Sequence, residues 1–258
     1  MSNGTHFRQD RQRGQRPDGP GSQGYSCPDA PDAVCSFFEL YGEFDQLQDL
    51  DDDQRGSAEW AVFKDWAERR GNCRDSSFGG FTGEGGHEHE VVRHDGYYLK
   101  RTRWTKSGLT YDVETKQILP ATVSEYLFRL AWQDFFFKTK TAILGLAEEA
   151  PFRYAIVTRQ EEVTGRAPSE REMKDCLDRS GFELVVAPPC GPVGGGGALY
   201  LFDNLFYIAD VRTDNCLVFP CDNDALCLTA WDFFIAPVDE KARKVMIDML
   251  RRFYQARA

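Results

Sequence analysis

Three polar side chains suited to phosphoryl transfer lie close together in the sequence, and a fourth follows after a strand-like hairpin. In this reaction the charge lies on peripheral oxygens, so a protein mainly orients the attacking hydroxyl and holds divalent metal ions against the phosphates. Asp210 is therefore predicted to take or orient the hydroxyl proton, and Arg212 to neutralise charge near the transferred group. Asn215 and Asp232 are predicted to hold the metal ions. Acidic chains often contain such a spacing, so the prediction depends on the residues upstream.

A glycine-rich segment and a lysine upstream are predicted to bind phosphates. Residues 79–86 read GGFTGEGG and predict a turn between two strands, followed by an Asp-Gly hairpin and a third strand at 97–102. Glycine lets the backbone lie close to phosphates, and Lys100 is predicted to point inward and reach them as a point charge. The glycines predicted to contact the nucleotide are Gly83, Gly85 and Gly86.

A helix is predicted after the lysine strand, beginning beyond Pro120 and covering residues 123–131. Glu125 lies in its first turn, where it is predicted to pair with Lys100 and hold it in place. Apolar residues recur at helical spacing on one stripe of this helix. They are Leu127, Leu130, Ala131 and Phe135.

The following segments are predicted to bind the base and to carry Asp210 to the site. Residues 155–158 are typical of a buried strand, and 160–163 of a link between two lobes, where backbone groups can hydrogen-bond an adenine edge. Residues 198–202 and 205–209 predict two strands that lead to Asp210. The residues predicted to contact the base are Thr158, Gln160 and Glu162.

Local signals predict three further features. Ser169 as cap, with Glu172 at the capping-box position, predicts the start of a helix that ends at Gly181. A turn is predicted at Asp203-Asn204. The four glycines at 194–197 predict a flexible connection, because no strand leads into them and no lysine follows.

Taken in order, these segments resemble the serine/threonine/tyrosine kinase domain of polyvalent proteins from phages and conjugative elements, a divergent branch of the protein-kinase-like fold. The resemblance covers residues 73–240. It implies an ATP- and Mg²⁺-dependent phosphotransferase with a compact, two-lobed α+β fold: an antiparallel-sheet N-lobe with one main helix and a reduced C-lobe, preceded by N-terminal helices. The matching stretches are residues 85–91, 100–102, 124–130, 156–160, Gly165, 180–182, 210–215 and Asp232.

The chain departs from the usual kinase pattern in several places. Ile208 and Ala209 stand where His-Arg would precede Asp210, and Phe234 stands where a glycine would follow Asp232-Phe233. There is no Ala-Pro-Glu segment, and too few residues follow Asp232 to build a large peptide-docking lobe. The acceptor is therefore left open between a protein and a small molecule, as in the aminoglycoside phosphotransferases. A pseudokinase or nucleotide-sensing interaction module is the alternative that uses the same fold without turnover.

Composition and segment boundaries limit the other function classes. The chain has 258 residues and a formal net charge of −10, which argues against nucleic acid as the main partner. It contains no apolar run of the length needed to cross a bilayer, so the expected location is cytoplasmic.

Residues 1–32 carry almost no large apolar side chains and predict a disordered tail. The remaining divisions are a helical extension at 33–72, the N-lobe and hinge at 73–165, and the reduced C-lobe at 166–258.

Two helices are predicted in the extension, at 33–47 and 57–70, separated by an acidic linker at 51–53 and by Gly56. Aromatic residues recur three positions apart on the second helix, a stripe that usually packs on its own domain. The alternative is a segment that binds a partner or inhibits the site. The stripe consists of Trp60, Phe63 and Trp66.

The cysteines and histidines allow metal or redox chemistry, but simpler interpretations are favoured. None of the eight cysteines forms a Cys-x2-Cys pair, and without a secretion signal we expect reduced thiols. His87 and His89 would share one face of a strand, with His94 nearby, and could hold a metal. We expect instead a polar outer face of a hairpin.

Overall fold

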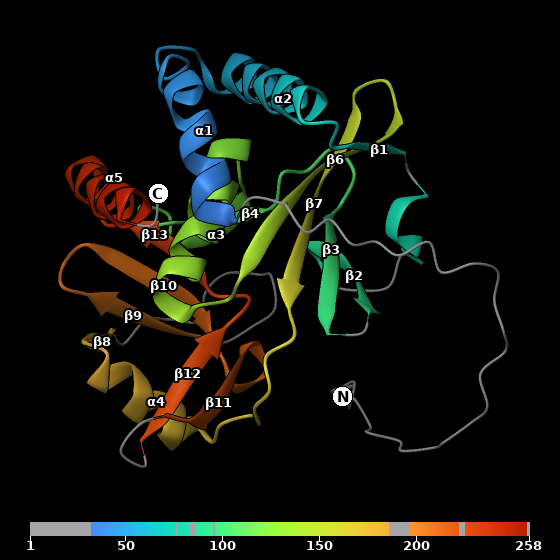
Figure 1. Ribbon diagram of the computed structural model, residues 1–258. Coiled ribbons are helices and arrows are strands. Elements are labelled where there is room, and N and C mark those ends of the chain that lie inside the picture. The colour runs from blue at the N-terminus through green and yellow to red at the C-terminus, as the bar shows by residue number, and fades with distance from the viewer. Residues whose placement is uncertain are drawn as a thin grey trace, which may run out of the picture.

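The computed structural model describes residues 32–75, 77–82, 86–94, 96–185, 197–221 and 225–256. Within them the chain is a mixed α+β fold, as predicted (Figure 1). Apart from Asp32, the predicted tail lies outside the described residues, as do Gly83 and Gly85 of the glycine-rich segment.

A five-stranded sheet forms the right-hand side of the molecule in Figure 1, with strand order β1-β6-β7-β3-β2. All its pairs are antiparallel except β1 with β6. The buried stretch predicted at 155–158 lies within β7, and β2 pairs with β3 as the predicted hairpin, with Gly96 at a φ of 84°. The strands are β1 (Cys73–Asp75), β2 (His89–His94), β3 (Tyr97–Thr102), β6 (Thr141–Ala150) and β7 (Arg153–Glu161).

The glycine-rich segment lies between two strands in the sequence, as predicted, but these two strands are not neighbours in the sheet. The strand before it, β1, lies at the opposite edge of the sheet from β2. The reason is the close approach of the preceding chain to β6: Leu146 N donates to Asn72 O at 3.1 Å, and a Cβ on Gly145 would come within 2.0 Å of that oxygen. Glycine at 145 therefore lets the chain enter the sheet beside β6.

The strands from β8 to β12 belong to a second group and lie at the lower left of Figure 1. A four-stranded antiparallel sheet has the order β13-β10-β9-β8, and two hairpins, β11–β12 and β4–β5, lie outside it. The turn predicted at Asp203-Asn204 joins β9 to β10, and both residues have positive φ. The strands are β4 (Leu109–Asp112), β5 (Gln117–Pro120), β8 (Phe182–Val185), β9 (Ala198–Phe202), β10 (Phe206–Val211), β11 (Cys216–Pro220), β12 (Leu226–Ala230) and β13 (Phe234–Pro237).

Side chains at the N-termini determine where the helices begin. Thr122 and Ser169 each start a capping box, the latter as predicted. The acidic linker predicted at 51–53 is wrong: Asp51 caps α2 by accepting from Gln54 N, and the next two aspartates lie in its first turn, where the helix dipole favours negative charge. The helices are α1 (Ala33–Asp45), α2 (Asp52–Arg69), α3 (Val123–Phe137), α4 (Glu170–Arg179) and α5 (Glu240–Gln255).

One hydrophobic cluster joins the helices to both groups of strands. It includes residues from the N-terminal helices, from α3 and β6, and from the C-terminal strands and α5. The aromatic stripe of α2 packs into this cluster through Phe63 and Trp66, as the first of the two interpretations predicted, with Trp60 partly buried against it. None of the described helices is both long and apolar enough to cross a membrane.

Candidate functional site

A cavity of about 430 Å³ lies between the five-stranded sheet and the segment that runs from β10 to β12. Its walls come from β2, β3 and β7 on one side and from β10, β11 and the residues after β12 on the other. Most of the predicted site residues meet here although they are far apart in sequence. Those that line the cavity are Gly86, Lys100, Gln160, Asp210, Arg212, Asn215 and Asp232.

Asp210 is at the centre of a short hydrogen-bonded loop at the end of β10. Its φ of 57° is left-handed, and the residue is 9% exposed. The Asn215 side-chain amide donates to both the carbonyl oxygen and Oδ2 of Asp210, each at 3.0 Å. Arg212 Nε lies 3.3 Å from Asp210 Oδ1 and 3.4 Å from a carboxylate oxygen of Asp214. These contacts fix the direction of the Asp210 carboxylate.

Gly197 is required beside Asp210 for steric reasons. A Cβ at position 197 would lie 2.5 Å from Asp210 Cα and 2.8 Å from its Oδ1. The last of the four glycines therefore lets β9 approach the candidate base closely, a role that the prediction of a flexible connection missed. The other three lie outside the described residues.

Burial raises the pKa of Asp210 to about 6. The neighbouring carboxylates of Asp232 and Asp214 also raise it, whereas Arg212 and the Asn215 hydrogen bond lower it. A base is most effective when its pKa lies near the working pH, so this carboxylate is suited to accept a proton at neutral pH.

Lys100 and Asp232 face each other across the cavity. Lys100 Nζ lies 3.9 Å from Asp232 Oδ1 and 3.4 Å from the carbonyl oxygen of Trp231. In the sheet Lys100 pairs with Val91 on β2 and Thr158 on β7, so it lies on the central part of the wall. A cation and a carboxylate are thus placed beside the Asp210 loop.

The expected pairing of Glu125 with Lys100 is wrong. The Glu125 carboxylate accepts from Thr122 N at 2.8 Å and completes the capping box of α3. It occupies the third position of the helix, where a glutamate turns back toward the cap. Farther along α3, Arg129 and Gln133 reach the surroundings of the cavity instead.

Two of the predicted base contacts, Thr158 and Glu162, do not line the cavity. Thr158 is 1% exposed, so its side chain is buried. Glu162 forms an ion pair with Arg93 and is not among the residues that line the cavity. Gln160 lines the cavity, as do Glu161 and Val163 from the same predicted link.

A buried polar cluster beside the cavity was not predicted. His89 is 6% exposed, so the expectation that it belongs to a polar outer face is wrong; His87, in contrast, is exposed. His89 Nε2 lies 2.8 Å from the Tyr126 hydroxyl and Nδ1 lies 3.5 Å from Glu88 Oε2. Burial lowers the pKa of His89 to about 3, so the imidazole is neutral at physiological pH.

Glu88 is held by two donors. Its Oε1 accepts from Leu109 N at 2.7 Å and from Arg129 at 2.6 Å, and both side chains of the ion pair are at least nine-tenths buried. An arginine within the apolar sequence of α3 was the signal that could have indicated this, because a buried guanidinium needs a carboxylate partner.

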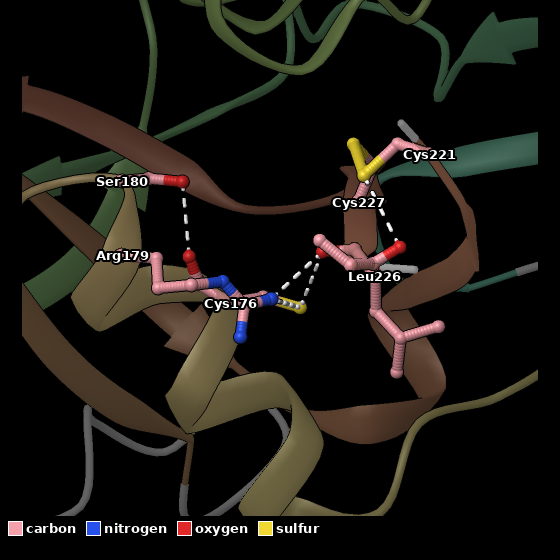
Figure 2. Close-up of a disulfide and its surroundings, with 7 residues drawn as sticks. Cys176, Arg179, Ser180, Cys221, Leu226 and Cys227 are labelled. Carbon is pink, nitrogen blue, oxygen red and sulfur yellow. Dashed lines mark hydrogen bonds between the residues drawn. A yellow bond between two sulfur atoms is a disulfide. The ribbon is translucent and has the colours of Figure 1, made fainter. Parts of the chain in front are cut away.

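The β11–β12 hairpin, which lies between Asn215 and Asp232 in the sequence, carries a disulfide bond (Figure 2). Cys221 and Cys227 are bonded at the far end of β11–β12, so the prediction of reduced thiols is wrong for this pair. Their Cα atoms are 5.6 Å apart, within the usual range for a disulfide, because the pairing of β11 with β12 brings the two cysteines close together. The carbonyl oxygen of Leu226, next to Cys227, accepts from Cys176 Sγ at 3.3 Å and from Arg179 at 2.8 Å, which attaches α4 to the same end.

Sequence and structure comparisons gave no matching family model, no matching curated protein and no matching solved structure. The functional interpretation therefore rests on the geometry of the site.

Proposed function

We propose that this protein is an ATP- and Mg²⁺-dependent phosphotransferase that acts on a hydroxyl group. The observation that supports it best is the meeting of Asp210, with its raised pKa, and the Lys100–Asp232 pair in one cavity. A proton acceptor, a phosphate-binding cation and a metal-binding carboxylate are the groups that phosphoryl transfer requires. In this proposal Asp210 Oδ1 accepts the proton of the attacking hydroxyl.

The mixed lining of the cavity supports a nucleotide as the ligand. Val91, Val163 and Leu217 contribute apolar surface, and the Asp210 loop and Lys100 contribute polar groups. A base needs apolar faces and a few hydrogen-bonding groups, which Gln160 and the chain beyond it can offer. The phosphates would then extend toward Lys100 and Gly86.

The charges around the cavity support a requirement for divalent cations. Four carboxylates line it, against two cationic side chains, Lys100 and Arg212. A nucleotide brings further negative charge, so binding needs added cations. The carboxylates are Glu88, Glu161, Asp210 and Asp232.

The side-chain oxygens of Asp232 and Asn215 differ in how readily they can bind a Mg²⁺ ion. The side chain of Asp232 is 42% exposed and offers a carboxylate oxygen, the ligand that Mg²⁺ prefers. The side-chain oxygen of Asn215 accepts from Arg212 at 3.3 Å, so Arg212 must release it before it can bind a metal. Bound Mg²⁺ would supply charge neutralisation on the phosphates.

The order of elements supports the proposed relation to the kinase domain of polyvalent phage and mobile-element proteins. The glycine-rich segment leads to β2, Lys100 lies on the next strand, α3 follows, and the β11–β12 hairpin separates the Asp210 loop from Asp232. Protein kinases place their phosphate-binding and metal-binding residues in this order. The two-lobed arrangement, the domain boundaries and the cytoplasmic location belong to the same proposal, and the acceptor is a protein or a small molecule.

A pseudokinase or nucleotide-sensing module is the second candidate, and one observation favours it. Glu125 caps its own helix and does not pair with Lys100, which contacts Asp232 instead. In protein kinases the corresponding lysine–glutamate pair must form before phosphate is transferred. A protein that only binds nucleotide has no need of that pair.

Nucleotide titration with and without Mg²⁺, combined with single-turnover phosphate transfer, tests both candidates. We expect Mg-ATP to raise the melting temperature, because a ligand that binds only the folded state stabilises it. Asp210→Asn should retain Mg²⁺-dependent nucleotide binding and lose roughly 10²- to 10⁴-fold in rate. Asp232→Asn should weaken the Mg²⁺-dependent binding itself.

The results separate the alternatives. Binding without transfer of label to the protein, to added proteins or to small hydroxyl compounds would favour the nucleotide-sensing module. The absence of any melting shift at millimolar Mg-ATP would contradict both candidates. Full activity in either aspartate variant would overturn the assigned roles.

A further inference from the structure

We propose that Glu88, His89 and Asp232 form a site for a divalent transition-metal ion, distinct from the Asn215–Asp232 pair. The inference deepens the proposed function and rests on it in one respect, because Asp232 is a ligand both in this cluster and in the Asn215–Asp232 pair. Each of the three residues offers a ligand atom, and these atoms all lie within 4.8 Å of one another. They come from the two opposite walls of the cavity, since His89 begins β2 with Glu88 directly before it, and Asp232 follows β12.

The ligand atoms are already oriented by neighbouring groups. Tyr126 hydroxyl lies 2.8 Å from His89 Nε2, which leaves Nδ1 as the nitrogen that faces Glu88. Arg129 and Leu109 N occupy Glu88 Oε1, and Oε2 lies 3.5 Å from His89 Nδ1. Metal-binding histidines and carboxylates in proteins are held by such outer hydrogen bonds, which fix the ring and the carboxylate before the ion arrives.

The donor set determines which ion is preferred. Mg²⁺ favours oxygen ligands and near-octahedral geometry, and it gives up water reluctantly. An imidazole nitrogen with two carboxylates suits Mn²⁺, Fe²⁺, Co²⁺ or Zn²⁺ better. The cluster is therefore expected to bind Mn²⁺ more tightly than Mg²⁺.

The surroundings of the cluster are compatible with a cation. Lys100 Nζ, 3.9 Å from Asp232 Oδ1, balances that carboxylate, but the lysine side chain is flexible and can move aside. Arg129 remains bonded to the opposite oxygen of Glu88. A metal here would lie between Lys100 and the end of the glycine-rich segment, on the side where the phosphates of a nucleotide are proposed to bind.

The test is Mn²⁺ binding measured by electron paramagnetic resonance on the full chain without nucleotide, with Mg²⁺ as competitor. We expect Mn²⁺ to bind at least about tenfold more tightly than Mg²⁺. Electron spin echo modulation should detect a nitrogen nucleus coupled to the bound Mn²⁺, a signal that needs no variant. His89→Gln should abolish this signal and weaken Mn²⁺ binding on the order of 100-fold.

His87→Gln is the matched control, because His87 also lines the cavity but lies outside the ligand cluster. It should leave affinity and the nitrogen signal unchanged. Loss of Mn²⁺ binding in Asn215→Ala with full binding in His89→Gln would overturn the inference and assign the ion to the Asn215–Asp232 pair. A wild-type protein that binds Mn²⁺ without a nitrogen signal, or no better than Mg²⁺, would also overturn it. Because no nucleotide is present, these results do not depend on whether the protein transfers phosphate.

Discussion

The side-chain amide of Gln133 donates a hydrogen bond of 2.6 Å to the carbonyl oxygen of Phe233, the residue that follows Asp232. Gln133 is 2% exposed and Phe233 fully buried, so water does not compete for this bond. A second bond, from the Thr229 hydroxyl to Phe137 O at 2.9 Å, attaches the end of β12 to the end of α3. Gln133 therefore holds the residue next to Asp232, whereas Thr229 holds the strand that precedes it.

Replacement of Gln133 should weaken metal binding at Asp232 in addition to lowering the stability of the fold. Gln133→Ala leaves the Phe233 carbonyl without a donor, at a cost of roughly 1–3 kcal/mol in unfolding free energy. It also frees the backbone beside the candidate metal ligand, so we expect weaker Mg²⁺ dependence of nucleotide binding. Thr229→Val removes the second bond and serves as the control, with a stability cost but unchanged Mg²⁺ dependence. Equal Mg²⁺ dependence in the two variants would show that Gln133 has only a structural role.

The N-terminal helices should contribute to α3 through one buried carboxylate. Glu59 on α2 is 1% exposed and accepts from Ser124 N at 2.8 Å and from Ser124 Oγ at 2.9 Å. Glu59→Ala removes a cap and a negative charge from the N-terminus of α3, so we expect a loss of about 1–2 kcal/mol in chemical denaturation. Glu68→Ala, an exposed position on the same helix, should change stability by less than about 0.5 kcal/mol. Equal effects of the two substitutions would exclude the capping role.

Features set by neighbouring residues could be predicted from the sequence, whereas those set by distant contacts could not. The Ser169–Glu172 capping box and the Asp203-Asn204 turn depend on residues within one turn of chain, and both are confirmed. The same local rule explains the error at Glu125, whose capping bond to Thr122 took precedence over a distant lysine. The sequence at 122–125 has the capping-box pattern, which predicts this bond.

The burial of His89 and the edge position of β1 depend on parts of the chain that the sequence pattern does not connect. His89 is covered because Tyr126 on α3 and Asp232 after β12 approach it from distant positions. The parallel pairing of β1 with β6 depends on Gly145, about seventy residues farther along the chain.

The raised pKa of Asp210 predicts that its ionisation destabilises the folded protein. Below the ordinary carboxyl pKa of 3.8 the group is protonated in both the folded and unfolded chain, and it makes no difference to stability. As the pH rises toward about 6, Asp210 ionises in the unfolded chain before it does so in the folded protein, so the free energy of unfolding falls. Above that pH the free energy of unfolding stays lower by about 3 kcal/mol. Asp210→Asn should therefore be more stable than wild type at pH 8 and similar to it at pH 4, measured by denaturant titration at both values.

The same carboxylate gives a kinetic prediction. If Asp210 accepts the proton of the hydroxyl, the transfer rate should rise with pH through about 6, because only the ionised form is a base. Asp214→Asn is the control, since its side chain is 71% exposed and its charge raises the Asp210 pKa least among the causes. A rate independent of pH between 5 and 8 would argue against Asp210 as the base. The difference in stability between Asp210→Asn and wild type would still test whether the carboxylate is buried.

The disulfide between Cys221 and Cys227 should stabilise the hairpin without controlling the site. The two cysteines are six residues apart, and closing so short a loop is worth about 2 kcal/mol in unfolding free energy. The end of the hairpin nearer the cavity is held independently, since Trp231 N donates to Asn215 O at 3.2 Å. Reduction should therefore lower the unfolding midpoint of the wild type while nucleotide affinity changes by less than about twofold. Cys221→Ser/Cys227→Ser should show the lower midpoint with or without reductant. A large loss of affinity on reduction would instead show that the far end of the hairpin determines how Asn215 and Asp232 are aligned.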